Sequence, residues 1–334
     1  RTAIHAAVSA NPHKRHLVTS RVEHPAIKNL FEQYARQGYR VTFLPVDREG
    51  RLDLDEYHRS LSDDTAVVSL MWANNETGVI FPVAELAQAA RERGIVFHSD
   101  AVQAVGKVPI RLAETAVDML SLSGHKLHGP KGIGALYVRK GTKFQPLFVG
   151  GHQEKGRRAG TENVPGIVGL GAACALAPAH LEDLQTRVRG LRDRLEKELL
   201  QRVPNALVNG DRGQRLPNTT SIAFEYVEGE AILLMLNESG ICASSGSACT
   251  SGSLEPSHVL RAMGVPFTSA HGSIRFSLST YTTAAEVDAI VERVPAVIAR
   301  LREMSPFWRA AAGGSAGGPA EARAASNRPR RGPD

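Results

Sequence analysis

Short apolar segments rich in β-branched residues alternate with amphipathic segments through the first half of the chain. The apolar segments are typical of buried strands and lie at His16–Ser20, Val41–Leu44, Ala66–Trp72, Ile95–His98 and Met119–Leu122. Between them, helices are predicted from Pro25 to near Gly38 and over Pro82–Arg93. Strands separated by helices predict an α/β fold with a mostly parallel sheet, whose functional groups gather at the carboxyl ends of the strands.

The second half of the chain has longer helical patterns and fewer strands. The predicted elements are helices at Gly166–Ala177, Leu181–Gln201 and Ala284–Met304, and strands near Ser221–Phe224 and Ser273–Phe276. This pattern favours a smaller C-terminal α+β domain. We therefore expect a large domain over residues 1–180, a small domain over 181–308, and a disordered basic tail over 309–334 that is rich in Gly, Ala and Pro.

The bulk properties narrow the class of protein. The formal net charge is +6, but half of this excess lies in the tail, and the remainder lacks the interleaved aromatic residues typical of nucleic-acid binding. No apolar run approaches the roughly 20 residues that a membrane helix needs, and no secretory signal opens the sequence. These features predict a cytoplasmic enzyme that binds neither nucleic acid nor a membrane.

The three cysteines point to one working thiol. An odd number without a C-x-x-C pair argues against both a disulfide framework and structural zinc. Free cysteines are usually buried small hydrophobes, which is the role expected for Cys174 and Cys242. Cys249 differs, because its neighbours within Ala243–Gly252 are nearly all small or hydroxylated. An accessible thiol in such a loop suits a nucleophile.

Lys126 follows the predicted strand Met119–Leu122 closely. A partly desolvated lysine has a lowered pKa and can condense with an aldehyde cofactor. Ser123 and His125 are placed to supply hydrogen bonds to a phosphate. Lys131 is a poorer candidate, because turn residues hold it away from the strand end. The alternative interpretation of Lys126 is a solvated loop lysine.

Other polar residues belong to the same expected edge of the sheet. Asp100 is placed to pair with a pyridinium nitrogen, although an isolated Asp in this position is more often a helix N-cap. Gln103 is placed to reach a phenolic oxygen. His24 precedes a helix, where it either stacks on a planar cofactor or caps the helix. Asn75 either binds the substrate or serves ordinary turn chemistry, and Arg275 either binds a carboxylate or forms a structural ion pair.

Taken in order, these segments resemble the cysteine desulfurases of the class-V aminotransferase family, most closely their nitrogen-fixation (NifS) branch. The motifs lie between about His16 and Tyr281 and are Asn74-Asn75-Glu76-Thr77-Gly78, Ser99-Asp100-Ala101-Val102-Gln103, Gly124-His125-Lys126, Arg158-Ala159-Gly160-Thr161-Glu162-Asn163 and Ser244-Ser245-Gly246-Ser247-Ala248-Cys249-Thr250-Ser251-Gly252. The closing Ser305-Pro306-Phe307-Trp308 also resembles this branch. The resemblance implies fold type I of the pyridoxal-phosphate-dependent transferases, as in aspartate aminotransferase, and a homodimer.

The resemblance also implies a role for each candidate residue. Lys126 would hold pyridoxal phosphate and move the Cα proton of the substrate, His24 would stack on the ring, and Asp100 would pair with its nitrogen. The remaining cofactor ligands would be Asn75 and Gln103 near the phenolic oxygen, with Ser123, His125 and Thr161 of the partner subunit at the phosphate. Arg275 would bind the carboxylate of L-cysteine.

In this family the substrate sulfur passes to a cysteine, here Cys249, and leaves L-alanine behind. The persulfide sulfur would then reach an iron–sulfur scaffold protein, where Cys249 would at most ligate a cluster transiently. The family also has a segment before the position of Arg1 that supplies a phosphate-binding turn. We therefore expect the large domain to be N-terminally truncated here, with weaker cofactor binding or folding.

Three alternatives remain from the sequence. One is a metal site built from Asp100, His98, His125 and His128, although His98 is assigned to the core. Another is a non-catalytic, truncated relative that dimerises without cofactor. The third is a selenocysteine lyase, against which the loop around Cys249 argues.

Overall fold

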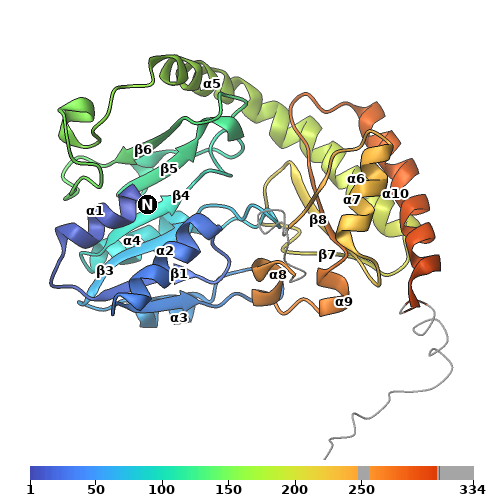
Figure 1. Ribbon diagram of the computed structural model, residues 1–334, viewed down its shortest axis with the longest axis horizontal. Helices are drawn as coiled ribbons and strands as arrows, with labels where there is room; N and C mark the ends of the chain where they lie inside the picture. The colour runs from blue at the N-terminus through green and yellow to red at the C-terminus, as the bar shows by residue number, and fades with distance from the viewer. Residues whose placement is uncertain (247–255, 307, 309–334) are drawn as a thin grey trace, which may run out of the picture.

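The computed structural model describes residues 1–246, 256–306 and 308. Cys249 and the expected tail 309–334 therefore lie outside the described residues. The described chain forms two β-sheets that one long helix joins (Figure 1).

The larger sheet has six strands in the order β2-β1-β3-β4-β5-β6. Their bounds are β1 His16–Ser20, β2 Arg40–Leu44, β3 Thr65–Met71, β4 Val96–Asp100, β5 Met119–Ser123 and β6 Gly134–Val138. The first five are parallel, and β6 at one edge runs antiparallel to β5. The expected α/β fold with a mostly parallel sheet is confirmed.

Helices cover both faces of this sheet, because successive strand residues point to opposite sides. Val67 packs with the apolar residues of α1 (Thr2–Ala10) and α2 (Pro25–Arg36). The next residue, Val68, packs with those of α3 (Leu54–Ser60) and α4 (Val83–Glu92). Short 3-10 turns lie at η1 Leu112–Glu114, η2 Gly124–Lys126 and η3 Gln153–Gly156.

One long helix leads from the larger sheet to the smaller one (Figure 1). Helix α5 (Val164–Asp183) continues through a π-helical turn, η4 (Leu184–Val188), into α6 (Arg189–Arg202). The two helices predicted for this region are therefore one continuous helix. The expected domain boundary near residue 180 lies inside it.

The smaller sheet has the strand order β7-β8-β10-β9, and each neighbouring pair is antiparallel. Its strands are β7 Ala206–Val208, β8 Thr219–Phe224, β9 Ser244–Ser245 and β10 Ser273–Ser277, and the helices beside it are α7 Gly229–Glu238 and α10 Ala284–Met304. The short helices α8 (His258–Ala262) and α9 (Phe267–Ala270) instead contribute apolar residues to the core of the larger sheet. Apolar residues of α6, α7 and α10 pack on β8 and β10 in a core of their own. The two strands and the last helix predicted for this half are confirmed.

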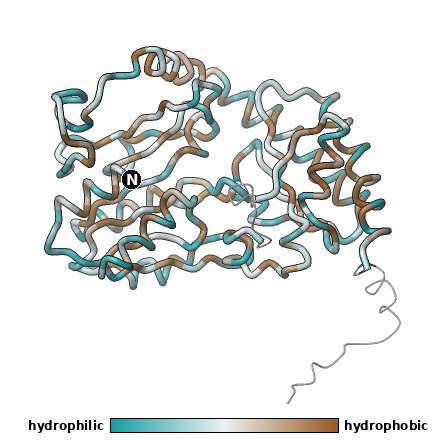
Figure 2. Tube along the Cα trace, in the orientation of Figure 1, coloured by the Kyte–Doolittle hydropathy of each residue, from teal (hydrophilic) through white to brown (hydrophobic). Residues whose placement is uncertain are grey.

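Helix α5 contradicts the expectation that no apolar run approaches the length that a membrane helix needs. Residues 164–181 contain no Asp, Glu, Lys or Arg, and the helix Val164–Arg202 is long and apolar enough to cross a membrane by length and composition alone. Only 17% of the most apolar 18-residue stretch of this helix is buried. Val168 and Leu176 are exposed, and Figure 2 shows the apolar stretch. One such helix is weak support for a membrane span, and an exposed apolar face also suits contact between subunits.

His98 lies in the core, as expected. From its burial we predict that the stability of the fold falls in acid. Its ring nitrogens lie 2.9 Å from Ser69 Oγ and 2.8 Å from Ser121 Oγ, and burial lowers its pKa to about 3. The unfolded chain takes up a proton there below about pH 6.5, whereas the folded chain stays neutral. Stability is therefore lost as the pH falls, by about 2 kcal/mol between pH 7 and pH 5.

Urea unfolding of the wild-type protein and of His98→Asn at these two pH values tests this expectation. The variant should be less stable at pH 7 but should lose less stability on acidification. An equal loss in both proteins would show that His98 is not the responsible group.

Candidate active site

Lys126 lies where β5 gives way to the turn η2, at the carboxyl end of the strand, as predicted. Gly124 makes this turn possible, because a Cβ there would lie 2.9 Å from the Ile133 side chain and 3.1 Å from the Pro130 carbonyl oxygen. Lys126 is half-buried, whereas Lys131 is exposed. The local sequence thus leaves Lys126 partly buried at the strand end, whereas Lys131 is exposed to solvent.

Asp100 ends β4 and pairs in register with Met71 of β3 and Ser121 of β5. Its Oδ1 accepts a hydrogen bond from the Val102 N–H at 3.0 Å. The chain forms turns after Asp100 and no helix begins there, so the N-cap interpretation is wrong. Burial raises the pKa of Asp100, and nearby His24 offsets only part of this shift. A nearby positive charge stabilises the ionised form of a buried carboxyl, so Asp100 suits a cationic partner.

His24 has the capping role considered for it, while its stacking on a planar cofactor stays a prediction. Its Nδ1 accepts a hydrogen bond from the Ala26 N–H at 3.1 Å and so caps α2. Its electrostatic interaction with Asp100 places it at the same edge of the sheet. The cap fixes the orientation of the ring beside the carboxyl.

Lys107 is a site residue that the sequence analysis missed. Its Nζ donates to Gln103 Oε1 at 2.8 Å and to the Gln103 carbonyl oxygen at 3.0 Å. Burial, and after it the charges of Lys126 and Arg275, lower the pKa of Lys107 to about 7. Three cationic side chains therefore converge, which makes the site attractive to anions. The sequence feature that could have indicated this role is a lysine four residues after Gln103 in an otherwise apolar stretch.

Arg275 connects the smaller sheet to this edge of the larger sheet. From the middle of β10, its Nη1 donates to the Asn75 carbonyl oxygen at 2.7 Å. The side-chain Oδ1 of Asn75 is buried and has no hydrogen-bond partner among the described residues. An unpaired buried acceptor is costly, so this atom suits a bound ligand.

The expected phosphate ligands are only partly assembled. Ser123 Oγ and His125 Nδ1 lie 2.8 Å apart at the end of β5. Thr161 is exposed, and within the described part of the chain no hydrogen bond joins it to the other predicted site residues. Its contact with a phosphate across a subunit interface stays a prediction.

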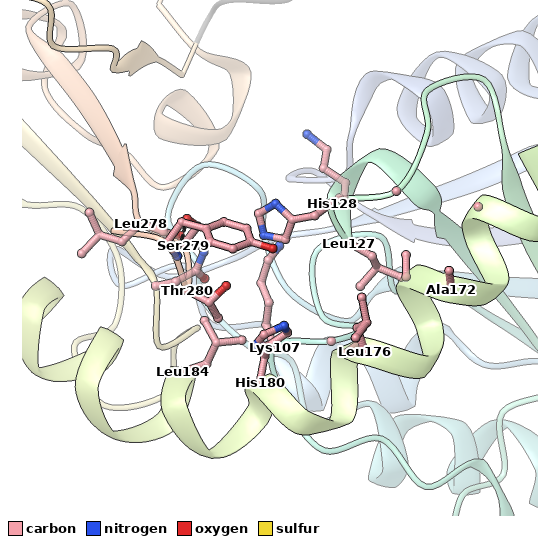
Figure 3. A pocket seen from close by; sticks show the side chains of 18 of the residues that line it. Lys107, Leu127, His128, Ala172, Leu176, His180, Leu184, Leu278, Ser279 and Thr280 are labelled. Atoms are coloured by element: carbon pink, nitrogen blue, oxygen red, sulfur yellow. Dashed lines mark hydrogen bonds between the residues drawn. The ribbon is translucent and has the colours of Figure 1, made fainter. Parts of the chain in front are cut away.

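A cavity of about 220 Å³ lies beside the predicted cofactor site (Figure 3). Its lining includes Lys107 and Lys126 together with residues of α5 and the segment 278–281. His24, Asp100 and Gln103 are not part of this lining. The cavity therefore shares Lys126 with the predicted cofactor site, while these three residues lie outside its lining.

The other cysteines require a correction. Cys174 and Cys242 were expected to be buried, but both are exposed. Cys174 lies on the exposed face of α5, and Cys242 follows α7, where few side chains cover it. Exposure alone therefore does not single out Cys249, which lies outside the described residues.

The alternative metal site is not assembled in the described part of the chain. There, no group of three or more His, Cys, Asp or Glu side chains is arranged to hold a metal ion. His98 is held between two serines, and His125 contacts Ser123.

Comparison with known proteins gives consistent matches along most of the chain. Residues 1–290 match the aminotransferase class-V family. A cysteine desulfurase from Nostoc sp. is 60% identical over 311 residues, which are 93% of this chain and 78% of that protein. The cysteine desulfurase NifS of Azotobacter vinelandii is 59% identical over 92% of this chain and 76% of its own length. A solved NifS-like protein matches with a TM-score of 0.83 at 36% identity, over 89% of this chain and 79% of that one.

Proposed function

The chain belongs to the class-V aminotransferase family and, within it, to the cysteine desulfurases, and on this premise we propose that it converts L-cysteine to L-alanine with pyridoxal phosphate and collects the sulfur as a persulfide on Cys249. The observation that best supports the proposal is that both sheets contribute charged groups to one place, because the charges of Lys126 and Arg275 both act on Lys107. Lys126 follows β5 and Arg275 lies in β10, while Asp100 ends β4, the neighbour of β5 in the larger sheet.

The residues at this site fit pyridoxal phosphate. The buried, unpaired Oδ1 of Asn75 needs a ligand, and the buried carboxyl of Asp100 suits a cationic ring nitrogen. Lys126 supplies the amine for covalent attachment. The other residues that would hold the cofactor are His24 against the ring, Gln103 near the phenolic oxygen, and Ser123 and His125 at the phosphate.

When bound, pyridoxal phosphate supplies an electron sink that weakens the bonds at the substrate's Cα and between its Cβ and sulfur. Arg275 binds the substrate carboxylate, and Lys126 Nζ moves the proton at Cα. The Cys249 thiolate attacks the substrate sulfur, so that an S–S bond forms while the C–S bond breaks. The electron pair left on carbon takes up a proton, which gives alanine.

The direct test is to incubate the purified protein with pyridoxal phosphate and L-cysteine. We expect one alanine for each persulfide on Cys249, measured by amino-acid analysis and mass spectrometry. Much faster turnover of L-selenocysteine would favour a selenocysteine lyase. Absence of both alanine and coenzyme absorption would favour a non-catalytic subunit.

Asp100→Asn tests the role of the buried carboxyl. The variant removes the counter-charge to the ring nitrogen, and we expect alanine formation to slow by about a hundredfold or more. Asp118→Asn is the matched control, since Asp118 also accepts a backbone hydrogen bond, from the Phe97 N–H at 2.8 Å, and has a raised pKa. Asp118 precedes β5, at the opposite end of the strand from Lys126. Equal rates in the two variants would contradict the assignment.

We also propose a homodimer that delivers sulfur to an iron–sulfur scaffold protein, with nitrogenase clusters as one destination. The exposed apolar residues Val164, Val168 and Leu176 of α5 support a subunit interface. The similarity to a NifS protein supports the pathway. Thr161 of the partner subunit would then complete the phosphate site.

A further inference from the structure

Glu76 is a buried carboxyl that none of the proposed steps uses. It follows Asn75 in the turn after β3, where Asn74 Oδ1 accepts hydrogen bonds from the N–H groups of Glu76 and Thr77 at 2.9 and 3.0 Å. Glu76 is 4% exposed, and burial raises its pKa to about 7. Burying a carboxyl is costly unless it is paired or hydrogen-bonded, so its partners indicate what it is for.

The Glu76 carboxyl lies beside Gly246 and Ser257, one on each side of the segment 247–255, which contains Cys249 and lies outside the described residues. On the C-terminal side, Ser257 Oγ donates to Glu76 Oε2 at 2.5 Å and also caps α8 by accepting from the Val259 N–H at 3.0 Å. On the N-terminal side, a Cβ at Gly246 would overlap Glu76 Oε2 and would lie 3.6 Å from Ser257 Cβ. Ser257 is therefore bonded to the Glu76 carboxyl, and Gly246 lies close to the same carboxyl.

Two further contacts connect this point to the substrate side of the site. Arg275 interacts electrostatically with Glu76, and its Nη1 donates to the Asn75 carbonyl oxygen. His258, next to Ser257, has its Nε2 2.8 Å from the carbonyl oxygen of Glu23, the residue before His24. The Glu76 carboxyl therefore interacts both with the guanidinium expected to bind the substrate and with Ser257, two residues after the segment that contains Cys249.

We infer that Glu76 is a positioning residue for sulfur transfer, which fixes the approach of Cys249 by holding Gly246 and Ser257 together beside Arg275. The inference rests on the proposed function, because it assumes that Cys249 accepts the sulfur. A nucleophile has to lie close to the atom it attacks, and a displacement of about 1 Å can cost about a hundredfold in rate.

The test uses the full chain loaded with pyridoxal phosphate. Ser257→Ala removes the donor, Glu76→Met removes the carboxyl at similar length, and Glu76→Gln restores an acceptor. We expect Ser257→Ala and Glu76→Met to keep the visible absorption of the coenzyme and its change on adding L-cysteine. Persulfide formation on Cys249 in a single turnover should fall about ten- to hundredfold, with partial recovery in Glu76→Gln. The Glu76→Met/Ser257→Ala double variant should be no slower than Glu76→Met alone, because both changes remove the same contact.

Ser269→Ala is the matched control. Ser269 is also buried, and its Oγ donates to Glu225 Oε1 at 2.9 Å, away from Glu76. Its persulfide rate should equal that of the wild type, and an equal fall in this variant would overturn the inference. Wild-type rates in Ser257→Ala would also overturn it, and this variant decides if Glu76→Met does not fold. Loss of coenzyme absorption would instead place Glu76 in the cofactor site. Alanine formation without persulfide in the wild-type protein would reject the proposed function itself.

Discussion

Replacing Lys126 with alanine is expected to remove the visible absorption of the coenzyme-loaded protein and to slow alanine formation by at least about a thousandfold. The amine both attaches the cofactor and moves the substrate's Cα proton, and loss of a general acid–base alone costs about 10² to 10⁴ in rate. Absorption spectra recorded after gel filtration report the attachment. Alanine measured over time reports the proton transfer.

Lys131→Ala provides the control for Lys126→Ala. The two lysines are close in sequence, but Lys131 is exposed beyond the turn, whereas Lys126 is half-buried at the end of β5. Lys131→Ala should therefore retain both colour and activity. Covalently bound coenzyme in Lys126→Ala, shown by mass spectrometry, would assign the attachment to another amine, with Lys107 the first to examine.

Replacing Cys249 with alanine is expected to separate cofactor chemistry from sulfur transfer. The protein should keep its visible absorption and its spectral response to L-cysteine, because the residues that hold cofactor and substrate are unchanged. Persulfide should disappear, and alanine formation without an added thiol acceptor should fall by at least about a hundredfold, since the sulfur has lost its nucleophile. Mass spectrometry of the intact protein after a single turnover measures this directly.

The other two thiols are suitable controls for Cys249. Cys174 and Cys242 are both exposed and are thus open to the same reagents. Cys174→Ala and Cys242→Ala should form persulfide at the wild-type rate. Persulfide on either residue in the Cys249→Ala protein, with alanine formed at an undiminished rate, would assign the acceptor role elsewhere.

The sequence predicts those parts of the fold that depend on local apolar patterns. The five parallel strands are each a short apolar run, and the carboxyl ends of such strands share an edge, so Lys126 and Asp100 were expected there. Helix α3 was missed, because it has seven residues and buries only Tyr57. The apolar character of α5 was underestimated, because its many small residues do not read as a hydrophobic run.

The missed contacts of Glu76 and Arg275 join residues distant in sequence. Glu76 and Ser257 are separated by 181 positions, and Arg275 and Asn75 by 200. Glu76 looks like an ordinary turn residue until Ser257 and Gly246 are placed around it. Lys107 likewise looks like a surface lysine until Lys126 and Arg275 are seen to affect its pKa. The cytoplasmic location stays a prediction, since neither fold nor site depends on it.

The π-helical turn between α5 and α6 accommodates an extra residue in the long helix without changing its helical phase. A π-helical turn holds about one residue more than an α-helical turn, so removing one residue within Leu184–Val188 would let the helix continue as regular α-helix. The smaller sheet packs on α6, so it would keep its orientation relative to α5, and Arg275 would stay beside Asn75. Removing one residue from a regular turn of α5 would instead rotate the remainder of the helix by roughly 100° about its axis. That deletion would carry Arg275 away from Asn75 without any change to a site residue.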